Sequence, residues 1–165
     1  MTRVYVALGS NIEPRKRLTQ AARLLTAEFP GIRFSSCFQN VAVGFDGADF
    51  INAAAGFDTK LTLAALVVLL HHIEEQCGRK RDDAKWAPRA MDLDILLYGE
   101  MISDSAVARV PRADLLRRAY MLGPMAELAP QLLHPEAHRT LADLWSELAP
   151  RTPPLSRVTI DLNAT

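Results

Sequence analysis

The chain has 165 residues, and its 19 Lys and Arg residues balance its 19 Asp and Glu residues, so the formal net charge is zero. This balance excludes the strong basic field that is typical of nucleic-acid-binding and membrane-surface proteins. The length suits one domain over residues 1–165, and no apolar run is long enough for a signal peptide or a membrane span. Cys37 and Cys77 form no CxxC pair. We therefore expect a cytoplasmic protein. We also expect a monomer, although nothing in the sequence determines the oligomeric state.

The first half of the chain predicts a strand, a helix and two further strands. A β-rich run at 3–8 ends in the turn Gly9-Ser10-Asn11, which could cap the helix that follows and that Pro30-Gly31 ends. Strand regions follow at 32–43 and 50–58. Glycines between these two regions favour antiparallel pairing of the two strands.

The second half begins with a helix from Leu63 to Gln76, for which Thr62 is a suitable N-cap and which Gly78 ends. The patterns that follow predict a strand at 91–97, a hairpin at 101–110, helices at 120–128 and 140–148, and an edge strand at 157–161. The order β, α, β, β, α, β predicts an α+β, ferredoxin-like fold. We expect a mostly antiparallel sheet, both long helices on one face, and extra C-terminal helices.

The most informative pattern is the strand that follows Met91. Residues two apart on a strand share a face, so Asp92 and Asp94 project together, about 6.5–7 Å apart at the backbone, while Leu93 and Ile95 face the core. Two neighbouring carboxylates repel each other unless a cation lies between them. Hard oxygen ligands that leave room for water and phosphate favour Mg²⁺. Two solvated aspartates on an open strand face are the alternative.

Cationic residues crowd the segment just before this strand. Arg79, Arg81 and Arg89 could bind the anion that a metal carries, although a run of charges is more often a solvated loop. The sequence has no GxxxxGK[ST] motif, so a polyphosphate would be held by side chains and metal. Trp86, in the same segment, could close over a ligand or fold back onto the sheet.

Other candidates lie outside this segment. His71 and Glu74 share a helix face, but no further His or Cys lies near them, which favours the lining of a pocket over a transition-metal site. Phe50 and Tyr120 could stack on a flat ligand, although aromatic residues are more often part of the core.

Taken together, these residues resemble the 6-hydroxymethyl-7,8-dihydropterin pyrophosphokinase family over about residues 4–135. The matching motifs are VALGSN at 6–11, FINAA at 50–54, IE and GRKR at 73–81, WAPRAMDLDILLYG at 86–99, VPR at 110–112, and RAYMLGPMAELAP at 118–130. The WAPRAMDLDI element is far more specific than an isolated pair of aspartates.

The resemblance implies transfer of pyrophosphate from ATP to the hydroxymethyl group of the pterin, with release of AMP, in folate biosynthesis. It implies that Asp92 and Asp94 hold two Mg²⁺ ions that bridge the ATP phosphates and the acceptor hydroxyl, and that Arg79 and Arg89 complete the catalytic set. The other implied roles are binding of ATP by His71, Glu74, Arg81, Trp86 and Arg112, and binding of the pterin by Asn52, Phe50, Tyr120, Arg118 and Val43.

The chain departs from the family pattern at two places. Residues 38–44 replace a common Tyr-x-Thr-x-Pro-x-Gly, and Arg112-Ala113 replace a common His followed by an aromatic residue. These departures leave open a divergent paralogue that binds nucleotide with weak or no turnover. A Mg²⁺-dependent nucleotidyltransferase or glycosyltransferase is a further alternative. The pairing of Asn52 and Phe50 with Tyr120 favours the pyrophosphokinase.

Overall fold

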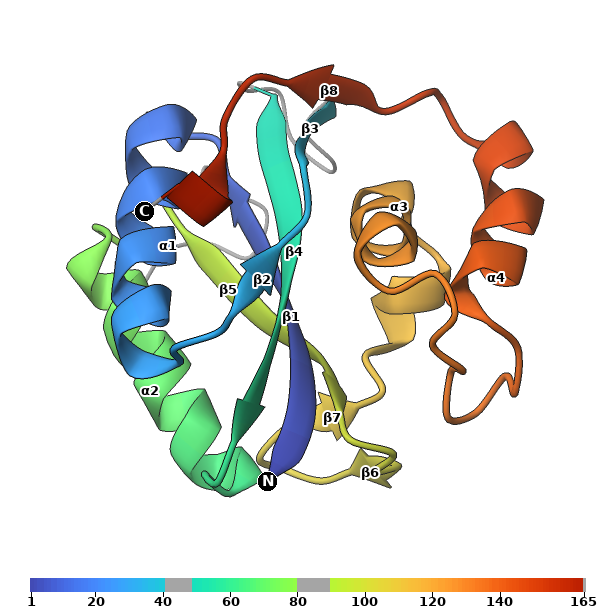
Figure 1. Ribbon diagram of the computed structural model, residues 1–165, viewed down its shortest axis with the longest axis horizontal. Coiled ribbons are helices and arrows are strands. Elements are labelled where there is room, and N and C mark those ends of the chain that lie inside the picture. The colour runs from blue at the N-terminus through green and yellow to red at the C-terminus, as the bar shows by residue number, and fades with distance from the viewer. Residues whose placement is uncertain (41–48, 80–89, 165) are drawn as a thin grey trace.

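Six strands form one antiparallel sheet in the computed structural model, which describes residues 1–40, 49–79 and 90–164 (Figure 1). The strand order is β5-β1-β4-β3-β8, and β2 also pairs with β4. The strands are β1 (Thr2–Ser10), β2 (Arg33–Phe34), β3 (Cys37–Asn40), β4 (Phe50–Thr59), β5 (Asp92–Tyr98) and β8 (Ser156–Val158). The predicted antiparallel pairing of the second and third strand regions is confirmed by the register of β3 against β4.

The strand region predicted at 32–43 is interrupted in the structure, and its last residues, 41–43, lie outside the described residues. Ser35 separates β2 from β3 because its own atoms pair with β4. The Ser35 amide donates to the Ala54 carbonyl at 2.8 Å, and the Ala54 amide donates to Ser35 Oγ at 2.8 Å. A side-chain oxygen thus replaces a backbone acceptor, and the regular ladder breaks at this point.

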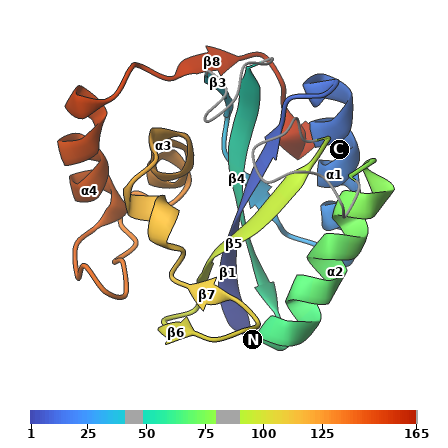
Figure 2. The same cartoon turned by 180° about the vertical axis from the view of Figure 1, so that it is seen from behind.

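Two long helices, α1 (Pro14–Glu28) and α2 (Leu63–Gln76), lie side by side on one face of the sheet, as predicted (Figure 2). Thr62 caps α2, since its Oγ1 accepts a hydrogen bond from the Ala65 amide at 3.1 Å. The expected cap of α1 at residues 9–11 is wrong. Ser10 is still part of β1, and the N-cap of α1 is Glu13, with φ 46° and no side-chain capping bond.

The core on this face is apolar and closed. Large side chains from β1, α1 and α2 are almost fully buried there, and the rings of Phe29 and Phe57 stack with centroids 4.0 Å apart. Burial of apolar area at this scale is the main stabilising contribution to the fold. The residues of this cluster include Val4, Val6, Leu8, Leu18, Leu25, Leu66, Leu70 and Ile73.

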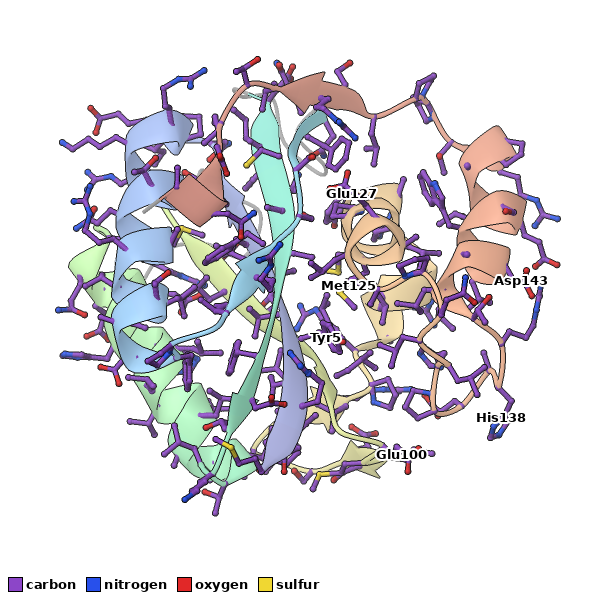
Figure 3. All side chains as sticks on the ribbon, in the orientation of Figure 1. Tyr5, Glu100, Met125, Glu127, His138 and Asp143 are labelled. Carbon is purple, nitrogen blue, oxygen red and sulfur yellow. The ribbon has the colours of Figure 1, made fainter. Side chains whose placement is uncertain are left out.

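The opposite face of the sheet carries α3 (Ala119–Leu128), and α4 (Leu141–Leu148) packs against α3 (Figure 1). Met125 of α3 and Tyr5 of β1 lie between the sheet and this helix (Figure 3). A small hairpin of β6 (Ser103–Asp104) and β7 (Arg109–Val110) and a short 3₁₀ turn, η1 (Ala113–Leu116), connect β5 to α3.

The C-terminal segment ties the two faces together. After the 3₁₀ turn η2 (Ala149–Arg151), the chain forms β8 at the outer edge of β3 and ends in η3 (Leu162–Ala164) beside α1 (Figure 1). Leu162 is buried in the α1/α2 core, and the side chain of Asn163 bonds both the amide and the carbonyl of Phe34, each at 2.9 Å. The predicted edge strand is confirmed, although it is shorter than expected.

The α+β class and the antiparallel sheet are therefore confirmed, and the finer ferredoxin-like assignment stays a prediction. In the part of the chain that the structure describes, no helix is long and apolar enough to cross a membrane.

Candidate active site

Three neighbouring strands bring the predicted site residues together on the sheet face that carries α3. Gly9 of β1 pairs with Asn52 of β4 on one side and with Asp92 of β5 on the other. Two residues earlier along β1, Ala7 pairs with Ala54 and Asp94. Because alternate residues share a face, the two aspartates, the asparagine and the glycine all project toward the same side.

Gly9 forms the floor between the asparagine and the aspartates. A Cβ atom at this position would lie 2.8 Å from Asn52 Oδ1 and 3.8 Å from a ring carbon of Phe50. The Asn52 amide nitrogen donates to Asn40 Oδ1, and Asn52 is only 7% exposed. The absence of a side chain on Gly9 thus leaves the Asn52 carbonyl oxygen room at the centre of this surface.

Asp92 is held by an arginine that a buried glutamate anchors. Arg79 Nη1 donates to Asp92 Oδ1 at 2.6 Å and to Glu74 Oε2 at 2.8 Å. The same oxygen of Glu74 accepts the Leu93 amide at 2.7 Å, on the backbone between the two aspartates. Glu74 is 1% exposed, so these described contacts are with the protein, and its predicted contact with ATP stays a prediction.

Asp94 is paired more loosely. Arg112 Nη1 lies 3.5 Å from Asp94 Oδ1, and the two side chains are 39% and 30% exposed. Burial against the sheet raises the pKa of the Asp94 carboxyl. The Arg112 charge lowers this pKa, and the Glu74 charge raises it further. The site therefore contains a carboxylate whose charge needs a nearby cation.

A pocket of about 370 Å³ adjoins Asp94 along the outer edge of β5. The strand order places β5 at the end of the sheet, so this edge has no partner strand among the described residues. His71 from α2, Asp94 from β5 and Arg112 line the pocket together, which brings three predicted site residues around one cavity. The β6–β7 hairpin supplies Arg109, and η1 supplies Asp114.

Arg118 and Tyr120 come from the beginning of α3. The Nε atoms of Arg79, Arg112 and Arg118 are buried and have no hydrogen-bond partner among the described residues. Burial raises the pKa of the Tyr120 hydroxyl, while Arg118 lowers it and Asp114 and Asp94 raise it. The Arg79 and Arg112 guanidinium groups beside Asp92 and Asp94 are suited to an anionic ligand that carries its own cation.

Four predicted residues, Arg81, Trp86, Arg89 and Val43, lie outside the described residues. Sequence reasoning missed Gly9 and Asp114 as parts of the site. Gly9 lies within the VALGSN motif that resembles the family, and Asp114 follows Arg112 by two residues. Both residues could have been proposed because they lie in or beside these motifs. In the described part of the chain, no group of three or more His, Cys, Asp or Glu residues could hold a metal ion.

The family model of 7,8-dihydro-6-hydroxymethylpterin-pyrophosphokinase matches residues 5–130. The chain belongs to this family. The match includes every residue of the site described above, from Gly9 to Tyr120.

Two curated members of the pyrophosphokinase family share substantial identity with this chain. Both are named 2-amino-4-hydroxy-6-hydroxymethyldihydropteridine pyrophosphokinase. The one from Pseudomonas aeruginosa is 42% identical over 139 residues, which cover 81% of this chain and 85% of the relative. The one from Bacillus subtilis is 37% identical over 132 residues, or 78% of each chain.

Solved structures share the fold of this chain. Wild-type HPPK-DHPS of Plasmodium falciparum, solved with SDX-DHP, superposes over 92% of this chain with a TM-score of 0.67. Its sequence identity is 14%, so this likeness shows the fold alone. The chain spans less than half, 44%, of the length of that longer protein.

Proposed function

We propose that this chain transfers pyrophosphate from ATP to the hydroxymethyl group of 6-hydroxymethyl-7,8-dihydropterin, giving AMP and the pterin diphosphate in folate biosynthesis. The observation that carries the proposal is the pair Asp92 and Asp94 on one strand face, with arginines against both carboxylates and a pocket beside Asp94. Family membership and the names of the curated relatives support the same reaction.

Mg²⁺ fits the donor set of this strand face. Asp92 and Asp94 would hold the metal, because carboxylates are hard ligands and two of them leave most of an octahedral shell to water and phosphate oxygens. Two such ions, bound together with ATP, would draw negative charge from the phosphates and polarise the acceptor hydroxyl.

ATP would occupy the pocket along β5, where His71 and Arg112 line the cavity. Arg79 would neutralise phosphate charge from a fixed position, because it donates to Glu74, which the Leu93 amide holds in place. In the transfer, the hydroxymethyl oxygen bonds to the β-phosphorus as the bond from that phosphorus to the α–β bridging oxygen breaks. AMP leaves with the bridging oxygen, and the hydroxyl proton passes to solvent. Arg81, Trp86 and Arg89 are proposed to act on ATP on the basis of the resemblance.

The pterin would lie on the same face of the sheet as the two aspartates, near Gly9 and away from the edge of β5. Asn52 would hydrogen-bond the polar edge of the ring, and Phe50 and Tyr120 would stack on its faces. Arg118, whose Nε has no partner among the described residues, and Val43 complete the proposed pterin site. We expect one domain that acts as a monomer in the cytoplasm. Size-exclusion chromatography with light scattering tests the oligomeric state.

No specific contact among the described residues favours the divergent paralogue or the nucleotidyltransferase or glycosyltransferase over this reaction. The divergent paralogue would bind ATP with weak or no turnover, and a nucleotidyltransferase would release pyrophosphate in place of AMP.

The test is product analysis with ATP, Mg²⁺ and 6-hydroxymethyl-7,8-dihydropterin. We expect AMP and pterin diphosphate in equal amounts, and a loss of about a hundredfold or more in Asp94→Asn. Asp104→Asn, an exposed aspartate of the β6–β7 hairpin, is the matched control and should keep the wild-type rate. ADP as the main product, or tight ATP binding without turnover, would contradict the proposal.

A further inference from the structure

The two aspartates of the site are neutralised by arginines that differ in how firmly they are fixed. Arg79 Nη1 binds Asp92 at 2.6 Å and Glu74 at 2.8 Å, and the Glu74 side chain is 2% exposed. Removal of Arg79 from this position would leave a buried carboxylate without its counter-charge, which is costly. The buried Glu74 therefore keeps Arg79 in place, whether or not a cation binds Asp92.

Among the described residues, Arg112 is fixed mainly through its backbone. Its amide donates to the Leu96 carbonyl at 2.9 Å, which sets the position of the Cα beside β5. Its side chain reaches Asp94 at 3.5 Å, is 39% exposed, and has a buried Nε without a partner among the described residues. Ion pairs at this exposure contribute about 0–1 kcal/mol, so Arg112 can leave Asp94 at little cost.

We propose that Arg112 is an exchangeable counter-ion of Asp94, which holds this carboxylate when no metal is bound and competes with the divalent cation for it. This inference rests on the proposed function, in which Asp94 ligates the cation. A carboxylate oxygen that faces a guanidinium group is less available to a metal, and the two positive charges also repel each other. The nucleotide-free chain therefore binds divalent cations weakly.

A bound nucleotide ends this competition, because its phosphate oxygens can bind both the Arg112 guanidinium and the divalent cation. Arg112 lines the same pocket as Asp94, so a guanidinium that leaves the carboxylate remains beside the bound polyphosphate. Nucleotide and divalent cation then each increase the affinity of the chain for the other, and Arg112 sets the coupling free energy between them. Arg112 acts here as a positioning residue that regulates access to the metal ligand.

The experiment measures binding of Mn²⁺, which suits the same oxygen ligands as Mg²⁺, by electron paramagnetic resonance titration of the nucleotide-free protein. We expect Arg112→Gln to bind Mn²⁺ about three- to fivefold more tightly than wild type, the fold-change that matches loss of one exposed ion pair. Arg112→Lys keeps the charge and should stay near wild type. Arg117→Gln removes the same charge from an exposed position of the same segment and should change affinity less than about twofold.

A second readout is the melting temperature without nucleotide. Added Mg²⁺ should raise it more in Arg112→Gln than in wild type, because a ligand stabilises the state that it binds. Unchanged or weaker Mn²⁺ binding in Arg112→Gln, or equal tightening in Arg117→Gln, would overturn the inference. Asp94→Asn separates the two proposals. If this variant binds Mn²⁺ with ATP as well as wild type does, the metal role in the proposed function fails, whatever Arg112 does.

Discussion

The two faces of the sheet use the same strands for opposite purposes. On β1, Val4, Val6 and Leu8 point toward α1 and α2 and are at most 1% exposed. The alternate residues on the other face include Ala7 and Gly9, whose small size leaves space beside Asp92 and Asp94. One face is therefore a closed apolar core, while the other combines packing against α3 with a polar site. This division predicts that stability and activity respond to different substitutions.

The largest expected effect is on the closed face. Phe57→Ala removes a side chain that is 1% exposed and stacks on Phe29, and should cost about 3–5 kcal/mol in the free energy of unfolding. Urea denaturation measures this cost, and Phe57→Leu, which keeps most of the volume, should cost less than about 1.5 kcal/mol. At a temperature where the variant is folded, the Michaelis constants should be unchanged. A raised constant for the pterin would show that the two faces are coupled.

Glu74 is the residue where the two faces meet, since it lies on α2 yet holds Arg79 and the backbone of β5. Glu74→Gln keeps the size and an acceptor for the Leu93 amide but removes the charge that fixes Arg79. We expect a loss of about 2 kcal/mol in stability, typical of a hydrogen bond to a charged group, with a reduced turnover rate. Glu75→Gln, at an exposed neighbouring position, is the control. Lower stability with full activity would mean that Arg79 keeps its position without Glu74.

The sequence predicted the features that depend on local periodicity. The alternation in β5 correctly assigned Leu93 and Ile95 to the core, and Thr62 correctly marked the start of α2. The break at Ser35 was missed because a serine hydroxyl took the place of a ladder acceptor, which no periodicity reports. The start of α1 was missed because Glu13 adopts a left-handed conformation that its residue type does not favour.

The partners within the site depended on the path of the chain. The aspartates and arginines were found from their motifs. The pairing of Asp92 with Arg79 depends on where α2 ends, and the pairing of Asp94 with Arg112 depends on where the β6–β7 hairpin ends. The C-terminal 30 residues had no usable motif. Their contacts, such as those of Asn163 with Phe34, join segments that lie far apart in sequence.

Gly9→Ala tests the polar site on the sheet face that carries α3. The added Cβ would lie 2.8 Å from Asn52 Oδ1, so the Asn52 amide must move from its present position. We expect pterin binding to weaken by about tenfold, because small displacements of a positioning group are costly, while the melting temperature changes little. Isothermal titration with pterin and a non-hydrolysable ATP analogue measures the change. Ala53→Gly, a matched exchange of the same two residue types on the closed face, should reduce stability and leave pterin affinity unchanged.

The smallest expected effect is a loss of stability at low pH that originates in the segment joining α3 to α4. His134 is 2% exposed, and its Nδ1 accepts the amides of Glu136 and Ala137, each at 3.1 Å. Burial lowers the pKa of this imidazole below its usual 6.5, while Glu136 raises it and His138 lowers it. The folded protein therefore favours neutral His134.

A base whose pKa is lowered by folding contributes its full stability above the pKa of the unfolded chain and loses it as the pH falls toward the folded pKa. The urea midpoint of the wild type should thus decrease between pH 7.5 and 5.5, and this decrease should be smaller in His134→Asn. His138→Asn is the control, because residue 138 is exposed, has φ 56°, and asparagine tolerates that backbone conformation. Equal pH dependence in wild type and His134→Asn would mean that other groups cause the acid sensitivity. Protection from hydrogen exchange, corrected for the intrinsic exchange rate at each pH, should fall at pH 5.5 in α4 but not in α1 or α2, as the separation of the two faces requires.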